Sequence, residues 1–329
     1  MNRTRSRALV AGVLAGVLGL AGKGLAEDWP SRPVTMVVPF AAGGPIDVGG
    51  RILAQRLSEV LGRQIVVENV GGAGGMTGTN RVAKAAPDGY QFVLGNIATH
   101  AFNQSLHKKP LYDAAAEFAP VGLTVEQPRV LAVRSDLPVN TLAEFIAYAK
   151  TNQATMQYGS AGPGSAAHVA CLLLNSVIGT NITHVPYRST TMAMQDMAAG
   201  RIDFICDVIS GALPFIQGNS VKPIAYLSPK RSPVLPHVAT AHEQGLANFD
   251  TSSWHAIFFP NGTPEAIVQR LNAGLSETLD TPVVRERLEN LGATVVAPER
   301  RSPDYLAKFL RSEIDKWAGP IKASGVASE

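Results

Sequence analysis

The sequence has 329 residues, a length that allows about two domains. Apolar residues make up 46% and charged residues 17% of the chain, so it can bury a sizeable core and is not disordered over most of its length. The formal net charge is only +3, and acidic and basic residues are interspersed without a basic stripe. This composition argues against a nucleic-acid-binding surface, and we expect no nucleic-acid partner.

The first 26 residues are typical of a secretory signal peptide. Three arginines within the first seven residues precede an apolar run over 8–21, and a Gly-Leu-Ala sequence ending at Ala26 provides small residues for cleavage. The apolar run is short for a membrane span, although an uncleaved anchor is the alternative. We therefore expect cleavage after about Ala26 and a soluble, periplasmic protein.

The two cysteines, Cys171 and Cys206, would then lie in an oxidising compartment. They either form a disulfide or act as two small buried apolar residues, and the sequence leaves both possibilities open. Their spacing matches no metal site.

The stretch over 34–62 is the most distinctive of the mature chain. A β-branched run over 34–38 predicts a buried strand, and small residues over 41–44 allow a sharp turn. Asp47 is expected to cap a helix whose apolar residues recur at helical spacing until Gly62. A strand, a glycine loop and a helix N-terminus in this order direct free N–H groups and a positive dipole at one point, which suits an anion. A tight strand-to-helix connection without a ligand is the structural alternative.

Short β-rich runs and helical runs alternate along the rest of the chain, which predicts an α/β protein with mostly parallel sheet. Further strands are expected at 65–68, 90–95, 130–133, 156–158, 182–185, 202–206, 224–227 and 253–259. A second glycine loop occupies 69–78 and a third loop of small residues 159–165, and Thr141 and Glu144 form a capping box.

The pattern changes near residue 130 and returns to its first form near residue 222. We therefore expect one lobe to comprise 27–127 and 225–329 and the second to comprise 128–224. Glycine loops follow strands in both blocks, at the sheet edge where ligands bind in open α/β sheets. Two lobes that each present such an edge predict a ligand cleft between them.

Several polar side chains beside the loops are candidates for ligand contact. Hydroxyls after strands suit a carboxylate. A capping role is favoured for Asp47, which could also contact a ligand, while Asp207 either holds a donor on the ligand or caps the next helix. A structural role is favoured for the histidine and a solvated one for the arginine. The candidates are Asp47, Thr99, Ser160, Ser165, His168, Tyr187, Arg188 and Asp207.

Enzymatic signatures are missing from the sequence. The glycines over 72–77 do not fit the dinucleotide fingerprint, and the chain has neither a Walker sequence nor a Gly-x-Ser-x-Gly elbow. The histidines are scattered without a metal-binding pair. We predict a protein that is not an enzyme and needs neither cofactor nor metal.

Several motifs together resemble the Bug-type receptors, the extracytoplasmic solute-binding proteins of tripartite tricarboxylate transporters. The resemblance extends from about Trp29 to Lys322. The motifs are VVPFAAGGPID (37–47), VEN (67–69) with GAGG (72–75), AAPDGY (85–90), HVPY (184–187), GRID (200–203) and KRSP (230–233).

The resemblance implies a two-lobe periplasmic-binding-protein fold of type II-like topology, with two crossovers between the lobes. It also implies a monomer that captures a small organic carboxylate and delivers it to transporter membrane subunits. Such receptors bind largely through backbone amides and ordered waters. The matching positions are Phe40, Ala41, Ala42, Gly43, Gly44, Asp47, Gly74, Gly75, Ser160, Gly164, His168, Tyr187 and Asp207.

Three positions depart from the family pattern. Ile46 stands where a threonine or serine is common, Gly71 where proline is usual, and Cys206 where an aromatic residue is usual. Because Ile46 removes a hydroxyl beside the expected carboxylate, a dicarboxylate or an aromatic acid is favoured over a tricarboxylate. The alternative functions are a ligand-sensing partner of a membrane kinase and an exported α/β enzyme that acts on a carboxylate.

Overall fold

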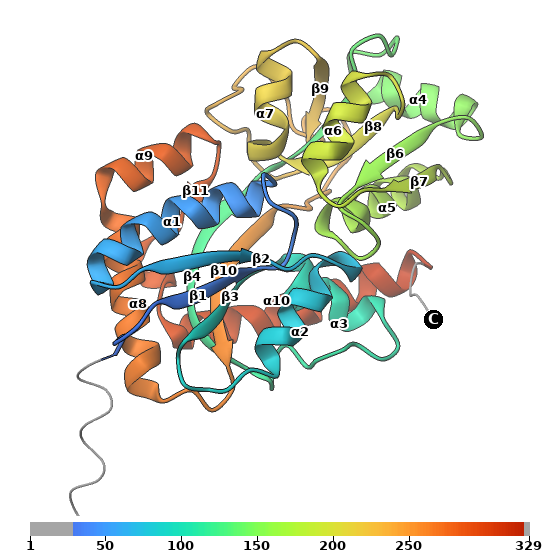
Figure 1. The fold of residues 1–329 in the computed structure, drawn as a ribbon. Coiled ribbons are helices and arrows are strands. Elements are labelled where there is room, and N and C mark those ends of the chain that lie inside the picture. Colours follow the sequence, from blue (N-terminus) through green and yellow to red (C-terminus); the bar gives the residue numbers. More distant parts are fainter. Residues whose placement is uncertain (1–28, 326–329) are drawn as a thin grey trace, which may run out of the picture.

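The first lobe is built on a six-stranded sheet of order β11-β4-β10-β3-β1-β2 (Figure 1). The computed structural model describes residues 29–325, so the expected signal peptide lies outside the described residues. The strands are β1 (Val34–Val38), β2 (Ile65–Asn69), β3 (Gln91–Asn96), β4 (Phe118–Gln127), β10 (Ser253–Pro260) and β11 (Thr294–Val295). β1 pairs in parallel with β2 and β3, whereas β10 is antiparallel to β3 and β4. The sequence predicted β1 correctly but did not predict β4, which Pro120 and Gly122 interrupt.

The second lobe is built on a separate five-stranded sheet of order β7-β6-β8-β5-β9. Its strands are β5 (Arg129–Arg134), β6 (Gln157–Ser160), β7 (Thr183–Pro186), β8 (Phe204–Val208) and β9 (Val221–Tyr226). β6 is parallel to β7 and β8, and β5 runs antiparallel to both β8 and β9. The loops that follow β6, β7 and β8 therefore lie at the same edge of this sheet.

Helices cover both sheets. Those of the first lobe are α1 (Pro45–Leu61), α2 (Met76–Ala83), α3 (Asn103–Leu106), α8 (Glu265–Asp280), α9 (Pro282–Asn290) and α10 (Pro303–Ala323), with short turns η1 (Ala73–Gly75), η2 (Ala98–Phe102) and η3 (Pro298–Arg300). Those of the second lobe are α4 (Leu142–Asn152), α5 (Ala166–Ile178), α6 (Thr190–Ala198) and α7 (Ile209–Gln217). Within 29–325, no helix has both the length and the apolar character required to cross a bilayer.

The chain passes between the sheets twice, first from β4 to β5 and then from β9 to β10. We expected the return to the first lobe at about residue 225, which is too early. β9 pairs with β5, and Leu227 and Ala241 belong to a buried cluster of the second lobe. The N–H of Thr251 also donates to the carbonyl of Leu227 (2.9 Å), so the chain leaves this lobe only at about residue 252. The sequence pattern did not predict this later return, because the apolar residues of β9 could pack in the core of either lobe.

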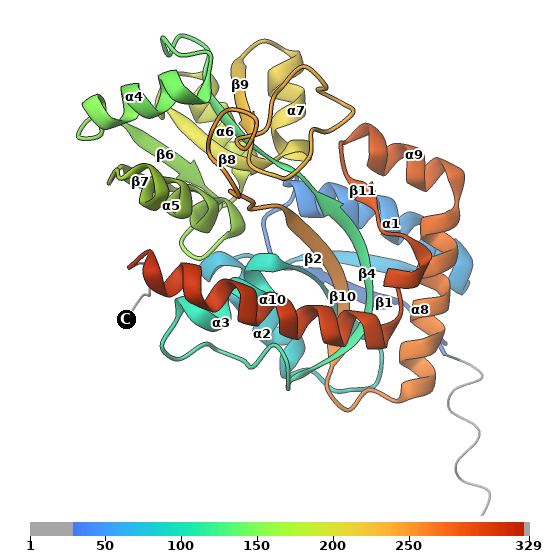
Figure 2. The same cartoon turned by 180° about the vertical axis from the view of Figure 1, so that it is seen from behind.

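The C-terminal helix α10 links the two lobes. Figure 2 shows it lying along the back of the first lobe and reaching α5. Leu306, Leu310 and Trp317 of α10 share a buried cluster with Val169 of α5. The carboxylate of Glu313 accepts hydrogen bonds from the indole N–H groups of Trp254 (2.9 Å) and Trp317 (3.2 Å). These bonds hold α10 on β10, next to the cleft.

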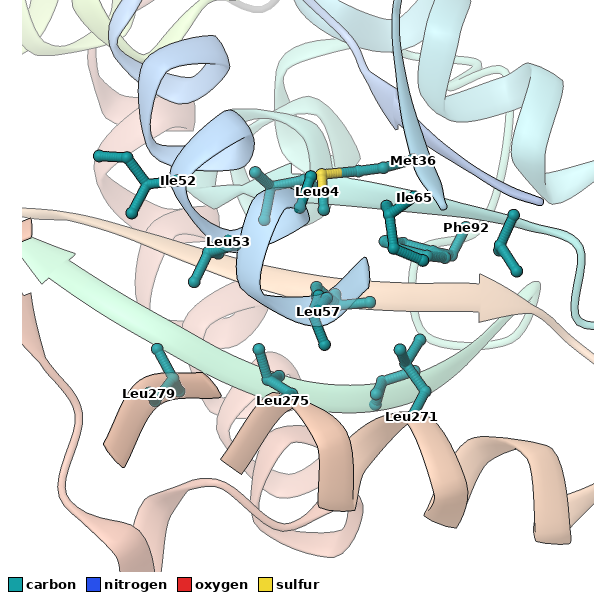
Figure 3. Packing of buried hydrophobic residues seen from close by; sticks show 14 of the residues in the cluster. Met36, Ile52, Leu53, Leu57, Ile65, Phe92, Leu94, Leu271, Leu275 and Leu279 are labelled. Carbon is teal, nitrogen blue, oxygen red and sulfur yellow. The ribbon is translucent and has the colours of Figure 1, made fainter. Parts of the chain in front are cut away.

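Helix α1 is held between the first sheet and α8 by its apolar face. Leu53 and Leu57 of α1 point toward Leu271 and Leu275 of α8 in Figure 3. The side chain of Leu57 is fully buried. Gly62 ends α1 in a left-handed conformation (φ 67°), as the sequence predicted. This packing fixes the N-terminus of α1 relative to the end of β1.

Truncating Leu57 tests whether this packing stabilises the first lobe. We expect Leu57→Ala to lower the free energy of unfolding by about 2–5 kcal/mol, because the buried cavity it leaves is surrounded by rigid elements. Urea unfolding followed by circular dichroism measures the change. Val48→Ala on the same helix, where the side chain is 38% exposed, should change stability by less than about 0.5 kcal/mol. Similar losses in the two variants would contradict the packing described.

Candidate ligand-binding site

Two adjoining pockets lie between the lobes. The inner pocket, with a volume of about 50 Å³, is lined by Phe40, Gly44, Pro45, Ile46, Asn96, Arg129, Ala161, Ser165, Ala166, Ala167, Ser189, Thr190, Asp207, Val208, Ser253 and His255. The outer pocket, of about 780 Å³, is lined by Phe40, Ala41, Asn69, Gly71, Gly72, Ala73, Gly74, Ala161, Gly162, Pro163, Pro186, Tyr187, Arg188 and Met192. Phe40 and Ala161 border both. The inner pocket has room for a few water-sized groups, and hence for one end of a small molecule.

The first glycine loop is anchored by a buried carboxylate. Oδ2 of Asp47 accepts hydrogen bonds from the N–H of Gly43 (2.9 Å) and from Nε of Arg51 (3.0 Å). Oδ1 accepts from the side-chain amide of Asn69 (2.9 Å), which also donates to the carbonyl of Phe40 (3.0 Å). The carboxylate thus joins the end of β1 to the end of β2. Sequence reasoning assigned no role to Asn69, although it lies in one of the motifs that carried the resemblance.

The expected capping role of Asp47 is wrong. Gly44 is the N-cap of α1, and Pro45 occupies its first position. Asp47 lies within the first turn and points back to the loop that precedes the helix. The helix therefore starts three residues earlier than the sequence reasoning placed it, with the proline at its first position.

The charge of Asp47 is stabilised by these bonds. Burial raises the pKa of the carboxyl, but the bonds from Arg51, Gly43 and Asn69 outweigh it and leave the pKa below its ordinary value of 3.8. The ionised form is therefore present at neutral pH and keeps both loops in place. Since its oxygens already accept three donors, Asp47 acts on the loops that border the pockets.

The second glycine loop approaches both its own lobe and the opposite one. A Cβ at Gly75 would lie 2.7 Å from Thr99 Cγ2 and 2.8 Å from Phe40 Cζ, within the first lobe. Gly74 has a φ of 62°, and a Cβ there would collide with the carbonyl of Pro163 and lie 2.7 Å from the carbonyl carbon of Gly164, both in the second lobe. Glycine at position 74 is therefore required by the close approach of the two lobes.

A hydrogen bond closes the cleft on its other side. The hydroxyl of Thr191, at the start of α6, donates to the carbonyl of Gly43 (2.9 Å). Gly164 lies against the first lobe as well, because a Cβ there would lie 2.8 Å from Asn103 Oδ1. The structure therefore has the lobes in contact on both sides of the pockets.

The third loop is held by side chains that bond within the second lobe. The Ser160 hydroxyl lies 2.7 Å from Nε2 of His184 and accepts from the N–H of Gly162 (3.0 Å). Nδ1 of His168 accepts from the N–H of Gly164 (3.1 Å), and burial lowers the pKa of His168 to about 3. Ser160 and His168 therefore shape the loop, which is the structural role that the sequence favoured for His168.

The outer pocket is bordered by the segment after β7. The phenol of Tyr187 donates to Asp196 (2.8 Å), and burial followed by this carboxylate raises the pKa of Tyr187 to about 12. Arg188 lies beside it in the same lining. This segment forms the second-lobe wall of the outer pocket, and Arg188 is exposed there, which agrees with the solvated role that the sequence favoured.

Three helix N-termini converge on the inner pocket. They are Gly44 and Pro45 of α1, Ser165 and Ala166 of α5, and Ser189 and Thr190 of α6. Each presents unbonded N–H groups and the positive end of a helix dipole. Together they create a site suited to an anion.

A buried arginine adds a full positive charge to this pocket. Arg129 is 1% exposed; its Nε donates to the carbonyl of Thr251 (2.9 Å) and its Nη1 to the carbonyl of Cys206 (2.9 Å). Burial lowers the pKa of Arg129, but a guanidinium stays charged in proteins. Sequence reasoning missed Arg129 because it precedes an apolar strand, where only the tertiary fold reveals a cleft.

Two further titratable groups face the inner pocket. Burial raises the pKa of Asp207 to about 6, against the opposing effects of Thr190 and Arg129. Burial, and then the charge of Arg129, lower the pKa of His255 to about 4, so this ring is neutral at pH 7. The pocket therefore combines a cation, a carboxylate and a neutral histidine.

The structure brings about half of the expected site residues to the pockets. Phe40, Gly44, Ser165 and Asp207 line the inner pocket, and Phe40, Ala41, Gly74 and Tyr187 line the outer one. The others support or flank the loops outside both linings; they are Ala42, Gly43, Asp47, Gly75, Thr99, Ser160, Gly164 and His168. Direct contact of any of these residues with a ligand stays a prediction.

The two cysteines lie behind the site as free, buried thiols. The N–H of Cys206 on β8 donates to the sulfur of Cys171 on α5 at 3.1 Å. In the described chain they act as small core residues, one of the two alternatives that the sequence left open.

Replacing Asp47 tests its role in holding the loops. We expect Asp47→Asn to lower the free energy of unfolding at pH 7 by about 1–3 kcal/mol, because the amide cannot accept from all three donors. The folded-state pKa lies below 3.8, so this stabilisation is present above pH 3.8 and is lost as the pH falls through the folded-state value. Chemical unfolding at several pH values should show the variant and the wild type converging on acidification. Asp136→Asn, whose side chain is 70% exposed, should match the wild type throughout.

Comparison with known proteins places this fold and site in a family. Residues 50–326 match the model of the tripartite tricarboxylate transporter family receptor, TctC. MatC from Rhodopseudomonas palustris, solved with bound malate, is 40% identical, with a TM-score of 0.87 over 89% of this chain and 100% of that one. The periplasmic binding protein BugD is 38% identical (TM-score 0.88; 92% and 100% covered). Rpa4515 of R. palustris, solved with adipate, is 34% identical (TM-score 0.86; 91% and 99% covered).

These likenesses confirm the two-lobe periplasmic-binding-protein fold that the sequence predicted. They also confirm a solute-binding receptor instead of an enzyme. The chain belongs to the TctC, or Bug, family of receptors of tripartite tricarboxylate transporters.

Proposed function

We propose that this protein captures a small dicarboxylate between its lobes and delivers it to the membrane subunits of a tripartite transporter. The observation that carries the proposal is the convergence of three helix N-termini and the Arg129 guanidinium on the inner pocket. Such an arrangement stabilises an anion and offers little to a sugar or a cation. The malate and adipate named for two similar proteins, both dicarboxylates, support the same class of ligand.

The two pockets suggest how such a ligand is arranged. One carboxylate enters the inner pocket, and the remainder extends past Phe40 into the outer pocket. Ile46 places an apolar side chain in the inner lining where the family commonly has a hydroxyl. This favours an acid with few polar groups over a tricarboxylate, and it leaves an aromatic acid as the second ligand class.

The family favours transport over the sensing alternative, because its receptors are named for a transporter. We propose that the chain is exported to the periplasm, that cleavage follows about Ala26, and that it acts there as a monomer.

A thermal-shift screen of the protein from Glu27 onward tests the ligand class. A ligand that binds only the folded state stabilises it by about 2.7 kcal/mol at a hundredfold excess over Kd, which should raise Tm by a few degrees. We expect dicarboxylates to give the largest shifts, and Ile46→Thr to increase the shift with more polar acids. Shifts confined to sugars, peptides or metal ions would contradict the assignment.

Adding one methyl group at Gly74 tests whether ligand capture requires the contact between the lobes. In Gly74→Ala the new methyl group meets Pro163 and Gly164 of the opposite lobe, so closure is obstructed while the first lobe is little disturbed. We expect ligand affinity, measured by calorimetry, to fall at least about tenfold, and X-ray scattering to show no contraction on adding ligand.

Gly62→Ala is the matched control for this variant. Gly62 has a similar φ of 67°, and a Cβ there would meet nothing within 4 Å. Both variants should lose about 1 kcal/mol of stability from the left-handed backbone, but only Gly74→Ala should lose affinity. Equal affinities would show that the lobes do not close at this contact.

A further inference from the structure

Within the described chain, the inner pocket contains three buried polar atoms that lack a hydrogen bond of ordinary geometry. Among residues 29–325, no hydrogen-bond partner of ordinary geometry is present for Nη2 of Arg129, Oδ2 of Asp207 or Oγ1 of Thr190. These residues are 1%, 2% and 6% exposed. Leaving such atoms unpaired away from water is costly, so a group that enters the pocket and bonds to them is strongly favoured.

The arginine and the aspartate approach the pocket from opposite faces of the second sheet. Val130 of β5 pairs with Asp207 of β8, so Arg129 and Asp207 differ by one position in register and their side chains leave opposite faces. Leu131, on the Arg129 side, packs with residues of α5, whereas Val130, on the Asp207 side, packs with residues of α6 and α7. The pocket therefore has one half beside Arg129 and α5 and another beside Asp207 and α6.

The two halves attract different groups. Arg129 and the N-terminus of α5, capped by Ser165, suit a carboxylate. Asp207, with a pKa of about 6, is mostly ionised at neutral pH and repels a second carboxylate. Its oxygen Oδ2, which has no hydrogen bond of ordinary geometry in the described chain, can accept from a donor on the ligand.

The charged groups around Asp207 indicate which chemical group on the ligand donates to it. The Asp207 carboxylate would attract an ammonium group, but the Arg129 cation and the positive N-terminus of α6 would both oppose it. A hydroxyl group is neutral, can donate to Oδ2 of Asp207, and can accept from the Thr190 hydroxyl, which is close enough to Asp207 to lower its pKa. A ligand that carries a hydroxyl beside a carboxylate therefore offers an anion to Arg129, a donor to Asp207 and an acceptor to Thr190.

We propose that the inner pocket selects the 2-hydroxycarboxylate end of its ligand, so that 2-hydroxydicarboxylates bind more tightly than unsubstituted or 2-amino dicarboxylates of the same length. Arg129 binds the carboxylate, Asp207 accepts from the 2-hydroxyl and Thr190 donates to it. This inference rests on the proposed function and names the substrate class within it.

Calorimetric titration with three acids of equal chain length tests the proposal. Malate carries the 2-hydroxyl, succinate lacks it, and aspartate replaces it with an ammonium group. We expect the wild-type protein to bind malate at least tenfold more tightly than either of the others. Asp207→Ala should weaken malate binding and leave succinate binding unchanged or stronger, which reduces the malate preference at least fivefold.

Two neighbouring threonines provide a second variant and its control. Thr190→Val keeps the shape of the side chain and removes the hydroxyl, so it should reduce the malate preference even where Asp207→Ala folds poorly. Thr191→Val removes the bond to Gly43, which touches neither half of the pocket, and should weaken malate and succinate by the same factor.

The outcomes separate this inference from the proposed function. Equal binding of malate and succinate by the wild type, or a preference that neither Asp207→Ala nor Thr190→Val alters, would overturn the selection of a 2-hydroxyl while leaving a carboxylate receptor. Binding of no acid at all would overturn both.

Discussion

The guanidinium of Arg129 is buried where the two lobes join, and the arrangement of the site depends on it. Its Nε bonds to Thr251 on the chain segment that returns to the first lobe, and Arg129 itself follows the first crossover directly. Its Nη1 bonds to Cys206, next to Asp207. A buried charge is destabilising unless it is paired, and two carbonyl oxygens satisfy it only in part. Both crossovers and the inner pocket are thus tied to one cation that an anionic ligand would help to neutralise.

Glycine residues and backbone atoms form the contacts between the lobes at the cleft. Gly74 allows the second glycine loop to touch the opposite lobe, and the carbonyl of Gly43 accepts the bond that closes the other side. These loops would be mobile without a support, and the support is the Asp47 carboxylate with Asn69. The rigidity of the site therefore comes from a buried polar network behind the loops.

The sequence predicted the parts of the fold that local patterns encode. The β-branched run over 34–38, the helix up to Gly62 and the capping box at Thr141 all formed as expected. β4 escaped detection because Pro120 and Gly122 disfavour a strand locally, and its pairing with β10 stabilises it nonetheless. The return to the first lobe was placed too early because pairing with β5, a contact distant in sequence, decides where β9 belongs.

The candidate site was predictable where glycine loops follow strands and unpredictable where side chains meet through the tertiary fold. Phe40, Gly44 and Gly74 lie in loops with a recognisable composition, and they border the pockets. Arg129, Thr190 and His255 come from three separate segments whose local sequences are ordinary. Their common feature is burial beside one another, which no local pattern records.

The hydrogen bond from Thr191 to the carbonyl of Gly43 has a consequence for how such receptors diversify. It holds the lobes together through atoms that line neither pocket, whereas the polar atoms of the inner pocket come largely from the second lobe. Substitutions in the pocket can therefore alter which solute is recognised while the hydrogen bond between Thr191 and Gly43 is kept. A receptor built on this scaffold can change its solute through a few substitutions in one lobe and keep the contact that joins its lobes.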